Sequence, residues 1–373
     1  MPASAGLVEA RRAVDHAASR RLVAVIPAHN EEDEIGRTLA ALTTQVPVDR
    51  VTVAADNCTD RTVEIARAAG AQVIETVGNT DKKAGALNQA LTRLLPELDD
   101  EDAVLVLDAD TAMADDFVAA ALEALAADPA RGAVGGIFLG RGAGSVLEQC
   151  QANEYARYGR EIERTRRVMV LTGTASIIRV QALREVAAHR GRTLPGLSGD
   201  VYDRTALTED MELTLALQSL GWSLASPAQC LTTTQLMPTV QALLQQRERW
   251  YRGALENLRT YGATEVTRRY LFQQVMLALG TLAMSLYLLL LLVDAVTGQL
   301  GLQPFWLGVG ALFTTERVVT AWRAGRSGRL LALSTIPELC YDVLLQVAFV
   351  KAVVASVRGA EQAWHHNTAP ARS

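Results

Sequence analysis

Cysteine is scarce in this sequence, and its spacing fits no metal site. Four cysteines occur among 373 residues, at positions far apart: Cys58, Cys150, Cys230 and Cys340. Metal-binding cysteines normally come in closely spaced pairs, so this arrangement argues against a metal site built on cysteine. We expect free thiols in a reducing compartment.

A positive charge excess and two common nucleotide-binding motifs are also missing. The formal net charge is −5, so no global positive field would recruit nucleic acid, and no nucleic-acid partner is expected. The motifs GxGxxG and GxxxxGK followed by Ser or Thr are absent, which disfavours a Rossmann dehydrogenase and a P-loop enzyme. Residues 1–20 have no apolar core, so we expect an N-terminal extension and not a signal peptide.

Long uncharged runs near the C-terminal end predict membrane helices. Residues 270–293 carry no charged side chain, and a helix of that length can cross a hydrocarbon core. A second helix is expected at 305–323. In the third apolar region, 330–357, charges interrupt the pattern, and spanning, re-entrant and interfacial arrangements all stay open. These charges are Glu338, Asp342 and Lys351.

Basic residues beside these runs predict the orientation of the chain. The clusters are Arg268 and Arg269 before the first run, and Arg323, Arg326 and Arg329 before the third. Because basic residues favour the cytoplasmic side, a hairpin of the first two spans would place both clusters and the N-terminal domain in the cytoplasm. We therefore expect a multi-pass protein of the cell membrane. Glu316 and Arg317, within the second helix, either lie near an interface or pair with neighbours, or they form a functional polar seam between helices.

The N-terminal part alternates strand-like and helix-like segments. Strands are expected at 21–28, 50–56, 71–76 and 103–110, with helices at 31–45, 57–70 and 82–95. This alternation predicts an α/β fold with a doubly wound, mainly parallel sheet, in which ligands bind beyond the carboxyl ends of the strands. Polar clusters follow three of these strands, at 29–31, 56–57 and 108–110. Farther on, 168–179 is expected to form a strand with a turn at Gly173, and 189–204 a mobile loop.

Two aspartates, Asp108 and Asp110, stand one residue apart at the end of the apolar strand in VLVLDADTAM (104–113). Carboxylate oxygens at this spacing suit Mg²⁺ or Mn²⁺ and leave metal positions for the phosphates of a nucleotide sugar. Haloacid-dehalogenase-type phosphatases show the same pattern, and there Asp108 would be the nucleophile. A solvated turn at the end of the strand is a third interpretation.

Three further positions each have a structural and a functional interpretation. Asp56 is either a helix N-cap or an acceptor for a nucleobase. Lys83 is either solvent-exposed or a positive charge beside a diphosphate. Asp210 follows Thr208 and Glu209, so it is either part of a capped first helical turn or a general base that removes a proton from a sugar hydroxyl.

The motif QRERW (246–250) lies on a predicted helix and also has two interpretations. Arg and Trp favour membrane boundaries, so Arg247, Arg249 and Trp250 are one candidate anchor at the interface. Alternatively, Trp250 stacks on a sugar, while Gln246 and Arg249 hydrogen-bond to the acceptor or to the diphosphate.

Six short motifs follow one another along the chain: IPAHNEE (26–32), ADNCTD (55–60), KAGALN (83–88), DAD (108–110), TED (208–210) and QRERW (246–250). Together with the apolar runs behind them, they resemble glycosyltransferase family 2, in particular its membrane-integrated branch of cellulose, chitin, hyaluronan and poly-N-acetylglucosamine synthases. The resemblance implies a GT-A fold. It also implies an inverting, metal-dependent transfer from a nucleoside-diphosphate sugar, most often UDP-linked, to a saccharide or lipid-linked acceptor.

Carried over by position, the resemblance implies roles for single residues on the donor side. Ala28 and Glu31 would lie near the nucleoside, and Asp56 would bind the base. Lys83 would sit near the nucleotide, and Asp108 would face the sugar diphosphate.

The resemblance also implies the metal, the base and the acceptor side. Asp110 would hold Mg²⁺ or Mn²⁺, and Asp210 would be the catalytic base. The residues that would border the acceptor and the diphosphate are Glu209, Gln246, Arg249 and Trp250.

The resemblance and the apolar runs divide the chain into five expected parts. These are an N-terminal extension (1–20), a GT-A-like catalytic domain (21–237), a helix carrying QRERW at the membrane interface (238–269), transmembrane or interfacial helices (270–357) and a C-terminal tail (358–373). Compared with the large synthases, the sequence has fewer spans, none before the catalytic domain, and no appended regulatory domain. Processive polymerisation, single transfer and a non-catalytic membrane scaffold therefore all stay open, as does a homo-oligomer.

Overall fold

The computed structural model describes residues 20–43, 48–299, 301 and 304–359. The expected C-terminal tail and N-terminal extension lie almost wholly outside these residues. The described chain forms two compact units. The sheet unit comprises the described residues up to Arg141 and those of Tyr158–Gln235, and the helical unit comprises Gly142–Arg157 and the described residues from Leu236 onward. All four cysteines are free thiols, as predicted.

The sheet unit is built on a seven-stranded sheet with the order β3-β2-β1-β4-β8-β6-β9. Its first four strands are parallel: β1 (Leu22–Ala28), β2 (Arg50–Ala55), β3 (Gln72–Glu75) and β4 (Ala103–Leu107). Every residue of β1 is buried, as is every residue of β4, because apolar side chains on both faces of these strands enter the core. The predicted parallel, alternating half of the fold is confirmed.

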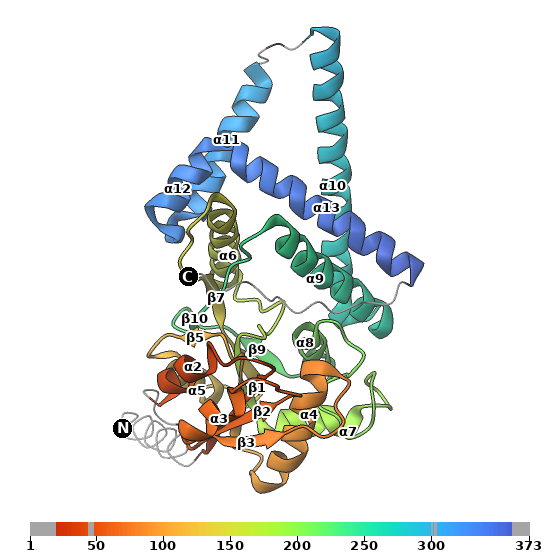
Figure 1. The fold of residues 1–373 in the computed structure, drawn as a ribbon. Helices are drawn as coiled ribbons and strands as arrows, with labels where there is room; N and C mark the ends of the chain where they lie inside the picture. Colours follow the sequence, from red (N-terminus) through yellow and green to blue (C-terminus); the bar gives the residue numbers. More distant parts are fainter. Residues whose placement is uncertain (1–19, 44–47, 300, 302–303, 360–373) are drawn as a thin grey trace, which may run out of the picture. The chain divides into compact units, whose positions relative to one another are not determined.

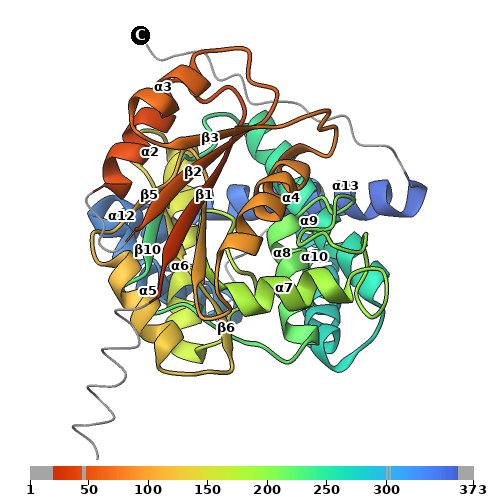
Figure 2. The same ribbon diagram turned by 90° about the horizontal axis from the view of Figure 1, so that it is seen from below.

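Helices cover both faces of this parallel half. The connecting helices are α2 (Ile35–Leu42), α3 (Thr62–Ala68), α4 (Lys82–Leu94) and the short η1 (Leu95–Glu97). Seen from below, α2 and α3 lie on one side of β1, β2 and β3, and α4 lies on the other (Figure 2). The sheet is therefore doubly wound, and the ends of its parallel strands open on one edge.

The other half of the sheet is mixed. Strand β8 (Ala175–Arg179) runs antiparallel to β4 and to β6 (Arg131–Gly135), and β9 (Ser223–Ala225) runs parallel to β6. A second, three-stranded sheet contains β5 (Ala112–Met113), β10 (Leu231–Thr234) and β7 (Ile137–Gly140). The remaining helices of the sheet unit are α5 (Phe117–Ala126), α7 (Val180–His189) and α8 (Glu209–Ser219), as labelled in Figure 1.

The strand predicted at 168–179 is too long. The structure begins β8 only at Ala175, and the backbone before it is irregular. In that stretch the N–H of Leu171 donates to the Thr214 hydroxyl at 2.8 Å, and the N–H of Gly173 donates to the Asp210 carboxylate at 3.3 Å. Side chains of α8 thus take backbone donors that a longer strand would have given to a neighbouring strand.

The helical unit contains one end of α6 (Val146–Thr165) and the C-terminal helices. These are α9 (Val240–Tyr261), α10 (Glu265–Thr297), α11 (Pro304–Thr320), the short η2 (Trp322–Ala324), α12 (Gly325–Ser334) and α13 (Ile336–Arg358). Two of them, α10 and α13, are long and apolar enough to cross a membrane, with mean hydropathies of 2.4 and 1.7 over their most apolar windows. Nearly all residues of that window in α10 are exposed or half-buried within the described chain, and Thr281 is buried.

The structure divides the later apolar runs differently from the prediction. The second helix, expected at 305–323, ends at Thr320 after 17 residues. The third region, 330–357, is split between α12 and α13, because Pro337 at the start of α13 cannot continue the preceding helix. Of these two later runs, the third and not the second therefore provides a helix of membrane-spanning length within the described residues.

Arg317 on α11 forms ion pairs with two acidic residues of α13. One Nη lies 2.9 Å from Glu338 Oε2, and the other pairs with Asp342. Glu338 is buried and also pairs with Arg157 at 3.0 Å. Pairing with neighbours, one of the two interpretations of Arg317, is thus what the structure shows.

Candidate functional site

The carboxyl ends of β1, β2 and β4 bring the predicted donor-side residues to one edge of the sheet. Ala28 is the last residue of β1, and its carbonyl accepts a hydrogen bond from the N–H of Asp56 at 2.8 Å. Asp56 follows β2 directly, and Asp108 follows β4. These strands are parallel neighbours, so residues far apart in sequence meet here.

Asp56 is fixed by neutral hydrogen-bond donors. Its side chain is buried, and Oδ1 accepts from Asn79 Nδ2 at 2.7 Å, Thr76 Oγ1 at 2.9 Å and Asn57 Nδ2 at 3.0 Å. The helix that follows is capped at Arg61 and not at Asp56, so the N-cap interpretation is wrong. Among the described residues no cation pairs with Asp56, and its three neutral donors hold the carboxylate in one orientation.

Lys83 forms the electrostatic centre of the site. It lies in the first turn of α4, and its Nζ is 2.7 Å from Asp108 Oδ1 and 2.9 Å from Glu209 Oε1. Its side chain is only 26% exposed, so the solvent-exposed interpretation is wrong. Burial by itself lowers the pKa of Lys83, but Asp108 and Glu209 outweigh it and raise that pKa well above its usual value. The ammonium therefore stays charged.

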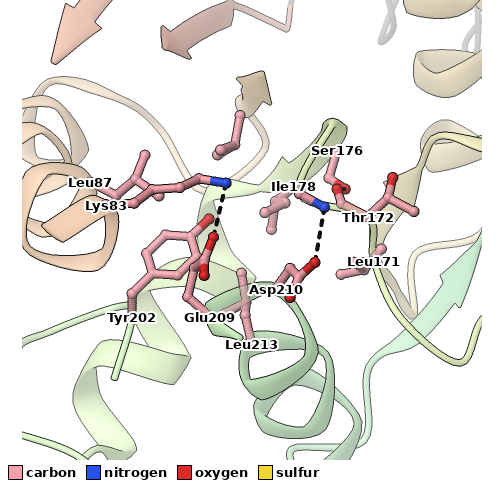
Figure 3. Close-up of a pocket in the computed structure, with 12 residues that line it drawn as sticks. Lys83, Leu87, Leu171, Thr172, Ser176, Ile178, Tyr202, Glu209, Asp210 and Leu213 are labelled. Atoms are coloured by element: carbon pink, nitrogen blue, oxygen red, sulfur yellow. Dashed lines mark hydrogen bonds and ion pairs between the residues drawn. The ribbon is translucent and has the colours of Figure 1, made fainter. Parts of the chain in front are cut away.

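Asp210 lies next to this ion-pair cluster, in the first turn of α8. Its Oδ2 accepts from the N–H of Gly173 at 3.3 Å, and its Oδ1 accepts from its neighbour Met211 at 2.7 Å. As predicted, Thr208 occupies the N-cap position of α8 and acidic residues follow in the first turn, although the Thr208 side chain makes no capping hydrogen bond. The carboxylate of Asp210 is instead directed at the loop before β8 (Figure 3).

Gly173 has no side chain at the point where Lys83, Asp108 and Asp210 converge. A Cβ placed on it would lie 3.1 Å from Lys83 Nζ, 3.4 Å from Asp210 Oδ2 and 3.7 Å from Asp108 Oδ2. A methyl group there would fill this space and press on the Lys83 ammonium, and it would be in ordinary contact with the two carboxylates. A small reacting group could therefore contact the cation and both carboxylates at once.

Glu31 and Asp110 add a concentration of negative charge beside Asp108. Burial, followed by Asp110 and Asp108, raises the pKa of Glu31 to about 7. Burial and then Asp108 raise the pKa of Asp110 to about 6. The resemblance gave Glu31 only a place near the nucleoside, and its electrostatic coupling to the two aspartates has no signal in the sequence.

These carboxylates suit a hard divalent cation. Oxygen ligands and excess negative charge favour Mg²⁺ or Mn²⁺. Among the described residues, however, no group of three His, Cys, Asp or Glu side chains could hold a metal ion by itself. An ion at Asp110 would take its remaining ligands from water and from the phosphates of a substrate, the usual mode for Mg²⁺ at nucleotide sites.

The remaining predicted residues, Gln246, Arg249 and Trp250, lie on α9 in the helical unit. The neighbouring Arg247 is buried within that unit: it donates to Glu154 at 2.8 Å and to Gln246 Oε1 at 2.6 Å. Its guanidinium also lies 4.2 Å from the centre of the Trp250 ring. Arg247 is therefore a packing residue of the helical unit, and an interfacial anchor is the wrong interpretation for it.

A pocket in the sheet unit joins these groups to residues for which the sequence predicted no role in the site. Its polar lining includes Lys83, Glu209 and Asp210 (Figure 3). Tyr202, from the loop before α8, and Gly173 also line it. A glycine inside a strand-like pattern is a signal of close approach by another group. No comparable pattern in the sequence marks Tyr202.

Residues 20–253, well over half of the chain, match the family described as "Glycosyltransferase like family 2". The chain belongs to this family. Its GT-A-like fold and its order of motifs are those expected from the resemblance, and the match covers both Asp108 and Asp210. Membership in family 2 overturns the haloacid-dehalogenase-type phosphatase, because the residues that match the glycosyltransferase family include Asp108 and the strand before it.

Curated relatives of this family-2 protein include a synthase and a glycosyltransferase from staphylococci. The chain is 25% identical over 261 residues to a poly-beta-1,6-N-acetyl-D-glucosamine synthase from Staphylococcus epidermidis, covering 66% of this chain and 57% of the relative. It is 46% identical over 65 residues to a 4,4'-diaponeurosporenoate glycosyltransferase from Staphylococcus aureus, covering 17% of each chain. The chain thus spans less than two thirds of the length of these relatives.

A solved structure shares the fold over nearly the whole length. It is the mannosyltransferase PcManGT from Pyrobaculum calidifontis, in complex with GDP-Man and Mn²⁺. The TM-score is 0.60 at 18% sequence identity, and the superposition covers 96% of each chain. At this identity the likeness is one of fold.

Proposed function

We propose that this family-2 protein is a membrane-bound, inverting glycosyltransferase. It moves a sugar from a nucleoside diphosphate, most often UDP, to a saccharide or lipid-linked acceptor. The observation that carries the proposal is the convergence of Lys83, Asp108 and Asp210 around the open space at Gly173. At this place Lys83 would stabilise the diphosphate and Asp210 would accept the proton of the attacking hydroxyl, both beside one bound sugar.

The donor side of the proposal uses the edge of the parallel strands. Asp56, held by its three amide and hydroxyl donors, accepts hydrogen bonds from the base. Ala28 and Glu31 border the nucleoside, and Asp108 faces the sugar diphosphate with Lys83 beside it. Asp110 would hold Mg²⁺ or Mn²⁺, which neutralises charge on the leaving diphosphate when bound.

In the transfer step one proton moves to the protein, one bond forms and one bond breaks. Asp210 takes the proton of the acceptor hydroxyl while the oxygen of that hydroxyl forms a bond to the anomeric carbon of the donor sugar. The bond from that carbon to the diphosphate oxygen breaks on the opposite face, so the configuration inverts. The positive charge of Lys83 stabilises the departing diphosphate, and the Gly173 N–H holds the Asp210 carboxylate in place.

The acceptor side is proposed from the family resemblance. Glu209 borders the acceptor, and it already contacts Lys83. Gln246, Arg249 and Trp250 complete the acceptor and diphosphate contacts. The two curated relatives have names that differ in kind, since one is a poly-beta-1,6-N-acetyl-D-glucosamine synthase and the other a 4,4'-diaponeurosporenoate glycosyltransferase. Product length from a purified reaction separates single transfer from polymerisation.

The membrane part of the proposal rests on the apolar helices. In α10, large apolar side chains such as Phe272, Leu282 and Leu290 are more than half exposed, and such a surface needs a nonpolar surrounding. The basic residues Arg268 and Arg269 at its start favour the cytoplasmic side. We infer a multi-pass protein of the cell membrane whose sheet unit is in the cytoplasm.

The test is release of nucleoside diphosphate from detergent-solubilised protein. UDP-glucose, UDP-galactose, UDP-N-acetylglucosamine, GDP-mannose and dTDP-sugars are each supplied with Mn²⁺ or Mg²⁺ and with membrane lipids as acceptor. Turnover with one donor, lost in Asp210→Asn while nucleotide binding persists, supports the proposal. Nucleotide binding with no turnover under any condition would instead support the non-catalytic scaffold. Full activity in Asp210→Asn would remove this residue from the mechanism.

A further inference from the structure

The segment between α7 and α8 is tied down along its length, although its composition predicts a mobile loop. Three of its glycines, Gly191, Gly196 and Gly199, have positive φ, which allows the backbone to fold back tightly. At Gly196 an added Cβ would also lie 3.1 Å from Arg190 Cδ, so this turn packs directly on that side chain. We call residues 190–204 the wall loop.

A buried ion pair holds the wall loop to the helix that carries Asp210. Arg190 is fully buried, and its guanidinium pairs with both oxygens of Glu212, one of them at 2.6 Å. The same guanidinium donates to the carbonyls of Pro195 at 2.9 Å and Val201 at 2.7 Å. One buried cation thus joins two points of the loop to α8.

Asn88 holds the wall loop from a second helix. Its Oδ1 accepts from the N–H groups of Val201 at 3.0 Å and Tyr202 at 2.9 Å, and its Nδ2 donates to the Tyr202 carbonyl at 2.8 Å. Asn88 itself is buried on α4, the helix that begins with Lys82 and Lys83. All three side-chain hydrogen bonds therefore fix the backbone of Tyr202 and of the residue before it.

The result of this anchoring is that Tyr202 lines the pocket beside Lys83, Glu209 and Asp210 (Figure 3). Its side chain is buried, and burial raises the pKa of its hydroxyl above the usual value, so the ring stays neutral. The pocket is otherwise bounded near the ring by apolar side chains such as Leu87 and Leu213. A rigid aromatic ring at this place limits how large a group can enter.

We propose that the wall loop is a fixed wall of the donor-sugar pocket and that Tyr202 sets the size of the sugar substituent that this pocket accepts. Arg190, Glu212 and Asn88 are positioning residues, since they hold the wall loop in place and are not among the residues that line the pocket. The proposal rests on the proposed function and deepens it, because it assigns discrimination between a hydroxyl and an acetamido substituent to one side chain.

The test compares UDP, UDP-glucose and UDP-N-acetylglucosamine by calorimetric titration of the full-length, detergent-solubilised protein. In Tyr202→Ala, the affinity ratio of the acetamido to the hydroxyl donor should rise by about tenfold or more, the scale on which small groups are discriminated in pockets. The affinity for UDP, which has no sugar, should stay the same. Tyr202→Phe keeps the ring and should keep the wild-type ratio.

Two further variants test whether a change in the affinity ratio comes from loss of the wall or from a general loss of packing. Asn88→Ala removes the three hydrogen bonds to the loop and should shift the ratio in the same direction, with UDP affinity preserved. Tyr158→Ala removes a ring that packs on Phe138 elsewhere in the sheet unit and should leave the ratio unchanged.

The outcomes distinguish this proposal from the proposed function. If the wild-type protein binds the UDP donors and Tyr202→Ala does not change the affinity ratio, the proposal for the wall loop is wrong. The proposed glycosyltransferase function would not be affected. An equal shift in Tyr158→Ala would overturn the proposal for the wall loop as well. A wild-type protein that binds no UDP donor would overturn both the wall and the UDP-sugar proposal.

Discussion

The N–H of Gly173 donates to the Asp210 carboxylate at 3.3 Å, and the side chain that glycine lacks would have pointed at Lys83 Nζ, 3.1 Å away. One residue thus orients the proposed base and leaves the space that a substrate would use. The contact joins the loop before β8 to the first turn of α8, so two segments that are distant in sequence define the reacting position.

Replacing Gly173 with alanine should therefore reduce kcat/KM for transfer by about tenfold to a hundredfold, because a misplaced contact near the reacting atoms is costly. Binding of UDP alone should change little, since the added methyl group points toward the sugar position. Gly280→Ala is the matched control, because a Cβ there meets no atom within 4 Å. Unchanged kinetics in Gly173→Ala would show that the space is not used.

Lys83→Met should weaken nucleotide binding, because Asp108 and Glu209 would then face a diphosphate with no cation between them. Lys83→Arg keeps the charge and should retain part of the affinity. Lys82→Met, in the same helical turn but outside the pocket lining, serves as the control. Titration with UDP measures all three, and wild-type affinity in Lys83→Met would contradict the proposed role.

Asp110→Ala should abolish the dependence of nucleotide binding on Mn²⁺. The carboxylate is the proposed protein ligand, and the described residues offer no complete cage that could replace it. Asp115→Ala, at an exposed position nearby in sequence, should bind Mn²⁺ and UDP as the wild type does. Equal UDP affinity with and without Mn²⁺ in the wild-type protein would refute the metal site.

Mn²⁺ affinity should rise with pH between about 5.5 and 7.5. The pKa of Glu31 is raised to about 7 and that of Asp110 to about 6, so both carboxyls gain protons as the pH falls through this window. A protonated carboxyl does not attract the cation, hence affinity is lost at the acidic end and reaches its plateau at the alkaline end. Manganese titrations of wild type and Glu31→Gln check this: the variant should lose the upper part of the rise.

The protein should remain in the membrane fraction after a high-salt or alkaline wash, because the large apolar side chains of α10, such as Leu282 and Leu290, are mostly exposed in the described chain. Replacing Leu282 and Leu286 by arginine should reduce this retention, since each charge at the centre of a span costs about 2.5 to 3.5 kcal/mol. Glutamine at Thr297, near the end of α10, is the control. Release of the wild-type protein by the wash would contradict the membrane assignment.

Much of the fold could be predicted because local patterns determine it. The alternation of apolar strands with short helices specifies a doubly wound sheet, and parallel strands necessarily bring their carboxyl ends to one edge. Asp56 and Asp108 could therefore be predicted together, although they are far apart in sequence. The uncharged run at 270–293 likewise determines α10 by length and composition alone.

The tertiary structure decided the features that depend on partners distant in sequence. The strand before Ala175 is shortened because Thr214 and Asp210 take its backbone donors. Lys83 is a paired and largely buried cation only because Asp108 and Glu209 converge on it, and Tyr202 lines the pocket only because Asn88 and the Arg190–Glu212 pair hold its loop. Sequence periodicity reports which face of an element is apolar, whereas these contacts depend on where different elements meet, and no local pattern records that.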